Sequence, residues 1–171
     1  KAVLTKGKEV YTHEFEITND PKSVISASAR EEQYKTAHML FDKIQELAYM
    51  VYQVDEMLKV ADELSIKVPS MKKMNSKISS ELNSLKNTMV VTTGDNYVGS
   101  AEKQLREKLG AIYSSVAGQF DAPSPSQKAN IENVMELFNT AKTKFESLKS
   151  SYLSKLTDTT TKNGITFKLK T

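Results

Sequence analysis

The chain has 171 residues, which suits one medium-sized domain built around a single core. Its 24 Lys and Arg residues nearly balance 21 Asp and Glu residues, for a net charge of +3, and the charges are scattered singly, which argues against a nucleic-acid-binding protein. Cysteine is absent, which excludes disulfides and thiolate sites, and no apolar run approaches the ~18–20 residues that a membrane-spanning helix needs.

Residues 1–18 predict a β-hairpin. Two runs of alternating character flank Gly7, and the second run places Tyr11, His13, Phe15 and Ile17 on one face. Two strands alone are only marginally stable in water, so we expect this hairpin to be the remnant of a preceding β-sandwich domain. Because the sequence starts at Lys1, without an initiator Met or a signal peptide, we also expect it to be a piece of a longer protein.

After Asn19-Asp20-Pro21, which favours a turn, four segments carry apolar residues at helical spacing. The first runs from about residue 26 to 64 and the second from Pro69 to about 90. The third starts near Val98 and the fourth near Ser126, its expected N-cap. Their apolar seams are Leu40, Ile44, Leu47, Val51, Val54, Leu58 and Ala61; Met71, Met74, Ile78, Leu82, Leu85 and Met89; Val98, Ala101, Leu105, Leu109, Ile112 and Val116; and Ile131, Val134, Phe138, Ala141, Phe145, Leu148 and Tyr152.

These patterns predict a mainly α fold, with residues 22–157 forming an antiparallel four-helix bundle in up-down-up-down order, since short connections reverse the chain direction. The fourth helix would then end where the first begins. Residues 164–170 alternate apolar and polar side chains, and we expect them to form a C-terminal strand that pairs with the hairpin and caps that end of the bundle.

The sequence predicts no catalytic, cofactor-binding or metal-ligating residue. His38 and His13 have no other ligand at a spacing that suits a metal site. The pair Glu31 and Glu32 lies in an early helical turn, where acidic residues stabilise the helix dipole, and adjacent helical positions do not converge on one substrate. No Gly-rich phosphate loop is present, although a Ser–His–Asp set could still assemble in three dimensions.

Two sets of side chains have both a structural and a functional interpretation. Met71, Met74 and Met89 fall on the second apolar seam, where core packing is favoured over a flexible peptide-binding groove. Tyr49 and Tyr52 lie off the first seam, and they either cover the edge of the core, which we favour, or form an exposed aromatic contact surface.

The chain resembles the C-terminal helical region of large bacterial sortilin-like proteins, in which BNR-type β-propeller repeats related to glycosyl hydrolases precede a small β-sandwich. The likeness rests on the strand that leads into Ile17-Thr18-Asn19-Asp20-Pro21, on the helix from Phe41-Asp42-Lys43-Ile44 to Val54, and on Asp121-Ala122-Pro123-Ser124 before a final amphipathic helix. It implies export to the periplasm or the extracellular space, and it implies that any hydrolase activity belongs to the propeller. None of its catalytic residues maps to this chain.

Three functions follow as hypotheses. The first is a non-catalytic accessory domain that stabilises, spaces or docks the propeller, with the adjoining β-sandwich and propeller as its covalent partners. The second is part of a glycan-processing enzyme whose active site lies in the propeller. The third is a helical module that binds a separate protein through the long first helix.

Overall fold

The computed structural model describes residues 1–18, 20–91 and 103–163, with side chains described up to residue 156. Within these ranges the chain is mainly helical, with four α-helices and one two-stranded antiparallel sheet. The prediction of a mainly α fold with a small β element is therefore confirmed.

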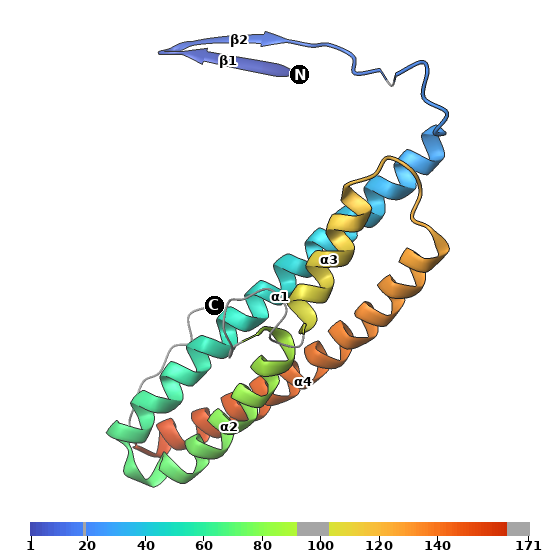
Figure 1. The fold of residues 1–171 in the computed structure, drawn as a ribbon. Coiled ribbons are helices and arrows are strands. Elements are labelled where there is room, and N and C mark those ends of the chain that lie inside the picture. Colours follow the sequence, from blue (N-terminus) through green and yellow to red (C-terminus); the bar gives the residue numbers. More distant parts are fainter. Residues whose placement is uncertain (19, 92–102, 164–171) are drawn as a thin grey trace.

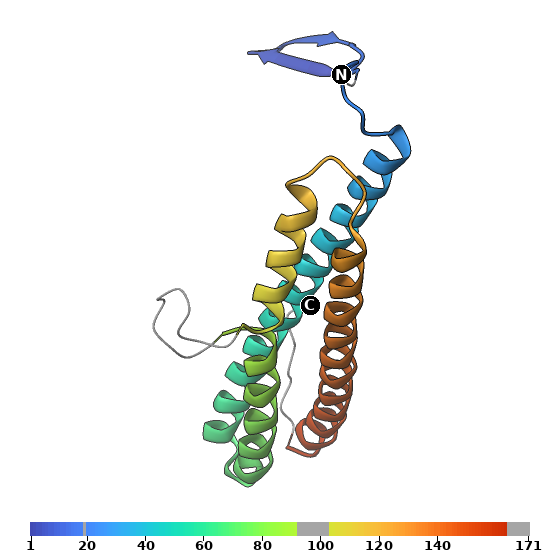
Figure 2. The same ribbon diagram turned by 45° about the vertical axis from the view of Figure 1, so that its right-hand side comes forward.

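The predicted hairpin is present. Strand β1 (Ala2–Lys6) pairs with β2 (Glu9–His13) in an antiparallel register that places Lys6 opposite Glu9. Gly7 has a φ of 62° in the two-residue turn, a backbone conformation that residues with a Cβ rarely adopt. All ten strand residues are exposed. The hairpin lies beyond one end of the helices (Figure 1; Figure 2), so no helix covers either of its faces.

Helix α1 (Ala27–Lys67) is the longest element, and Ser26 caps it by accepting a hydrogen bond from the backbone N–H of Ala29. It ends at Val68, because Pro69 begins a short 3₁₀ turn, η1 (Pro69–Met71), that leads into helix α2 (Lys72–Met89).

Helix α3 (Leu105–Ala117) starts with a reciprocal cap between Gln104 and Glu107. The expected start near Val98 lies outside the described residues. Helix α4 (Pro125–Asn163) starts two residues earlier than predicted: Ser124, not Ser126, is its N-cap, and the Ser124 side chain accepts a hydrogen bond from the Gln127 backbone N–H at 3.2 Å. The Gln127 side-chain oxygen in turn accepts a hydrogen bond from the Ser124 backbone N–H. This reciprocal pair makes Ser124 the better cap.

Helices α1 and α4 run in the same direction. Three side-chain pairs join them: Glu32 with Lys128, Glu46 with Lys142, and Gln53 with Lys149. In each pair the two residue numbers differ by 96, and a constant difference of this kind is possible only between parallel helices. Helices α2 and α3 both run the opposite way and follow one another along α1, with α3 nearer the hairpin (Figure 1). The predicted up-down-up-down order is thus not confirmed.

This arrangement has a simple cause in the helix lengths. Helices α2 and α3 have 18 and 13 residues, against 41 and 39 for α1 and α4, so the two short helices together match one long helix. Helix α4 therefore ends beside the end of α1 that is farther from the hairpin (Figure 1), and the expectation that it returns to the hairpin is wrong. The predicted strand at 164–170 lies outside the described residues.

The core runs along the whole helical part. The predicted seams are buried or partly buried wherever they are described, and they form one continuous apolar cluster. The most fully enclosed large side chains include Tyr152, Phe138, Phe145, Leu40 and Leu82. The three methionines on the second seam, Met71, Met74 and Met89, belong to this cluster, as the core-packing interpretation predicts.

Candidate functional site

The acidic residues considered for acid–base chemistry are engaged in ion pairs. Glu31 contacts Lys35 on the next turn at 2.6 Å, and Glu32 contacts Lys128 of α4 at 2.6 Å. The hydrogen bond and positive charge of Lys35 lower the pKa of Glu31 below its usual value, which keeps this carboxylate ionised rather than ready to donate a proton. The two carboxylates thus point to different partners and do not act on a common site.

Glu46 is the most connected carboxylate between α1 and α4. It accepts hydrogen bonds from Lys142 of α4 and from Lys43 of its own helix, and these bonds lower its pKa. The same contact raises the pKa of Lys142. This cluster holds α1 and α4 in register.

Two polar side chains lie inside the core. Asn75 donates to the Ala61 carbonyl at 3.1 Å and to the Ser65 hydroxyl at 3.2 Å, whereas its own carbonyl oxygen has no partner. The Tyr152 hydroxyl also has no hydrogen-bond partner. Burial, with a smaller contribution from Asp62, raises the pKa of Tyr152 to about 12. Both groups fill space between helices.

The described part of the chain contains no group of three or more His, Asp or Glu side chains placed to hold a metal ion. None of its helices is both long enough and apolar enough to cross a membrane. His38 is exposed and stacks on Tyr34, and His13 is exposed in the hairpin.

Two surface clefts have mixed linings. One, of about 270 Å³, lies where α2, α3 and α4 meet, and Lys108 and Lys144 line it beside Leu105 and Leu137. The other, of about 570 Å³, is an open hollow along α4 between Asn139 and Leu148. Neither brings together an acid, a base and a nucleophile.

The most distinctive surface is a row of aromatic rings on α1. We call it the aromatic face and define it as Tyr34, His38, Phe41, Tyr49 and Tyr52. At 3.6 residues per turn these five positions fall within roughly 80° of one another and span about 27 Å. The four large rings are 61%, 44%, 50% and 46% exposed for Tyr34, Phe41, Tyr49 and Tyr52, on the side of α1 opposite its buried seam.

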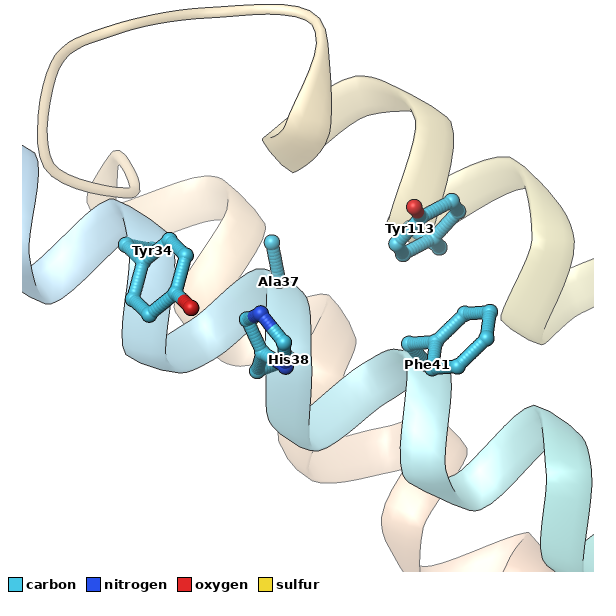
Figure 3. Close-up of a pocket in the computed structure, with 5 residues that line it drawn as sticks. All are labelled: Tyr34, Ala37, His38, Phe41 and Tyr113. Atoms are coloured by element: carbon cyan, nitrogen blue, oxygen red, sulfur yellow. The ribbon is translucent and has the colours of Figure 1, made fainter. Parts of the chain in front are cut away.

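The end of this face nearest the hairpin forms a groove of about 340 Å³ between α1 and α3 (Figure 3). Tyr34 and His38 lie one turn apart with ring centroids 4.4 Å apart, and Phe41 meets Tyr113 of α3 at 6.2 Å. Ala37 forms the floor between them, and aromatic rings form most of the rest of the lining (Figure 3). The other end of the face is the stacked pair Tyr49 and Tyr52, 6.3 Å apart.

Of these residues, the sequence singled out Tyr49 and Tyr52, where covering the core edge was favoured over an exposed contact surface, and His38, which was considered only as a metal ligand. Half of each tyrosine side chain is exposed, which fits the second interpretation. Tyr34, His38, Phe41 and Tyr113 were missed as a site. For Tyr34, His38 and Phe41, the sequence signal was a second periodic row of residues, at spacings of four and three, on the side of α1 opposite the main seam.

The hairpin provides a second uncovered surface. The register pairs Leu4 with Tyr11, so both lie on the same side, and these side chains are 66% and 55% exposed. Phe15, which the sequence predicted on the same face, lies beyond the end of β2 at His13 and is 54% exposed. Neither strand pairs with a third strand among the described residues. The hairpin therefore exposes apolar side chains on both faces, because Val3 and Val10 lie on the side opposite Leu4 and Tyr11, and its two outer edges are unpaired among the described residues.

Neither a protein-family model, nor a curated protein, nor a solved structure gives a significant match to the chain.

Proposed function

We propose that this chain is a non-catalytic structural module of a larger protein: its hairpin joins a β-rich body, and its helices form a rod attached to that body. The observation that carries the proposal is the hairpin, in which every strand residue is exposed. A two-stranded ribbon with an uncovered apolar face is marginal in water and prone to edge-to-edge association. Pairing with a further sheet removes both problems.

The helices need no such partner. They enclose a continuous core that extends from Leu40 at one end to Leu64 and Met71 at the other. The rod is joined to the hairpin by residues 14–26, and Ser23 and Asp20 close a turn within this segment through their backbones at 3.0 Å. This division into an uncovered hairpin and a packed rod is expected of a module whose first strands belong to a neighbouring domain.

The resemblance noted in the sequence supports a more specific identity for the body: the β-sandwich and propeller of an exported sortilin-like protein. Any glycan-processing activity would then reside in the propeller, and the rod would stabilise, space or dock it. The ion-paired carboxylates support a non-catalytic role for the chain itself, because each carboxylate of Glu31, Glu32 and Glu46 is held by a lysine. Turnover of aryl glycosides by the isolated chain, lost on mutation of one of its acids, would favour an enzyme instead.

The proposal is tested by Leu4→Asp, introduced into the isolated chain and into the full gene product that contains it. In the isolated chain Leu4 is exposed, so the thermal unfolding midpoint of the helices should not change. In the gene product the same carboxylate would be buried against the β-rich body without a partner, and we expect the unfolding midpoint of that body to fall by several degrees.

Lys8→Asp is the matched control, because Lys8 is exposed in the turn between β1 and β2 and lies on neither face of the paired strands. It should leave both midpoints close to those of the unmodified proteins. An unchanged midpoint for Leu4→Asp in the gene product would show that the hairpin face is not buried there, and the proposal would be wrong.

A further inference from the structure

The large exposed apolar side chains are unevenly distributed along the rod. Tyr34, Phe41, Tyr49 and Tyr52 lie on α1 between its start and a point just past its middle, and Phe120 lies in the connection at the hairpin end, where Arg30 packs over its ring at 5.8 Å. Beyond Tyr52, the described part of α1 exposes a single large apolar side chain, Ile66. The apolar surface of the rod is thus concentrated toward the hairpin.

The composition of this surface suits a protein contact. Tyrosine combines a large ring that gains from burial with a hydroxyl that can still bond at the rim of an interface, and aromatic residues are enriched in interface centres. The charged residues at the two ends of the aromatic face are already neutralised in pairs, Glu31 with Lys35 and Glu56 with Lys59. A partner that covers the face would therefore not bury an unpaired charge from any of these four residues.

The linker allows one body to contact both surfaces. Between His13 and Ala27 the chain can extend by up to ~3.3 Å per residue, on the order of 40 Å in total, whereas the aromatic face is about 27 Å long. A body that holds the hairpin can consequently lie beside α1 over the whole length of the face. It need not sit only at the tip of the rod.

We propose that the β-rich body that takes the hairpin also rests on the aromatic face of α1, so that the rod lies alongside this body instead of projecting from it. The inference depends on the proposed function, since it concerns the same body. The interface with the body then has two parts, the hairpin and the aromatic face. The second part consists of Tyr34, His38, Phe41, Tyr49 and Tyr52, with Tyr113 of α3 at its edge.

The absence of cysteine from the chain makes thiol labelling a clean test. Single variants Tyr49→Cys and His38→Cys report on the aromatic face, Leu4→Cys on the hairpin, and Ile66→Cys on the far part of α1 as a control. All four positions are exposed in the chain, so the substitutions should be tolerated. Each variant is reacted with a maleimide in the isolated chain and in the full gene product, with any cysteine elsewhere in that product replaced by serine.

We expect Tyr49→Cys, His38→Cys and Leu4→Cys to react at least tenfold more slowly in the gene product than in the isolated chain, while Ile66→Cys reacts equally in both. Protection of Leu4→Cys alone would overturn the inference and leave the proposed function standing. Protection of none of the three would overturn both. If Tyr49→Cys were already protected in the isolated chain, in a way that depends on protein concentration, the face would be covered by a second copy of the chain, and the inference would again be wrong.

Discussion

Phe138 is the residue at which the packing of the rod can be measured most simply. Its ring is fully buried in α4, and Lys43 of α1 lies over it at 5.0 Å. Phe138→Ala removes a large apolar side chain from a close-packed site and should lower the free energy of unfolding by about 3–5 kcal/mol in urea titrations. Glu132→Ala, an exposed change on the same helix, should be nearly neutral. A loss below ~1 kcal/mol at Phe138 would contradict the placement of the seam.

Tyr152 gives the rod a pH dependence at alkaline pH. Burial raises its folded-state pKa from 10.0 to about 12, so the folded state holds the phenolic proton more tightly than the unfolded state does. The resulting stability is complete below pH 10 and is lost as the pH rises from about 10 to 12. We expect the native chain to lose about 1–2 kcal/mol more than Tyr152→Phe does between pH 9 and 11.5.

The matched control for this titration is Tyr49→Phe, because Tyr49 is half-exposed. It should retain the pH dependence of the native chain. Identical alkaline profiles for the native chain and Tyr152→Phe would mean that the Tyr152 hydroxyl reaches solvent in the folded state.

At the scale of the elements, the sequence predicted what depends on local periodicity. The four seams and the turn at Gly7 follow from side-chain spacing and backbone preference, and the structure contains each of them where its residues are described. The direction of α3 does not follow from periodicity. A short helix can also continue along α1 beyond the preceding one, as α3 does after α2 (Figure 1), instead of turning back beside it.

The aromatic face was only partly predicted, because periodicity does not say which sides of a helix its neighbours cover. A helix with apolar or aromatic residues on two sides can bury both if enough neighbours surround it. Tyr49 and Tyr52 would cover a core edge in a bundle with a fourth helix on that side. Because α2 and α3 share one side of α1 in succession, α3 meets this face at its edge, where Tyr113 lies beside Phe41, and the four large rings stay 44–61% exposed.

Cross-linking distinguishes the parallel arrangement of α1 and α4 from the antiparallel one. Glu32 and Lys128 form an ion pair at 2.6 Å, so the double variant Glu32→Cys/Lys128→Cys should cross-link rapidly with a short bismaleimide. The control pair, Glu32→Cys/Lys155→Cys, combines position 32 with a residue near the other end of α4 and should not react intramolecularly. The opposite result would show that α4 returns toward the hairpin, as the up-down-up-down order requires.

At the scale of the whole molecule, a packed rod and an uncovered hairpin occupy one chain. The rod contains the continuous core, whereas Leu4 and Tyr11 remain exposed on the hairpin. Exposed apolar surface of this kind usually marks a contact, and a free strand edge invites pairing by main-chain hydrogen bonds. The proposed role of the chain, as a rod fastened to a β-rich body through its first two strands, follows from this contrast.

Amide hydrogen exchange at the hairpin tests this account most directly. In the isolated chain the amides of Val3, Thr5, Val10 and Thr12 should exchange within seconds, while those of the α1 seam, such as Leu47 and Val54, exchange slowly because they open only when the rod unfolds. In the full gene product the amides on the strand edge that pairs with the β-rich body should become as slow as the α1 seam. Hairpin amides that stay fast in the gene product, with α1 slow in both forms, would contradict the claim that the hairpin completes another sheet.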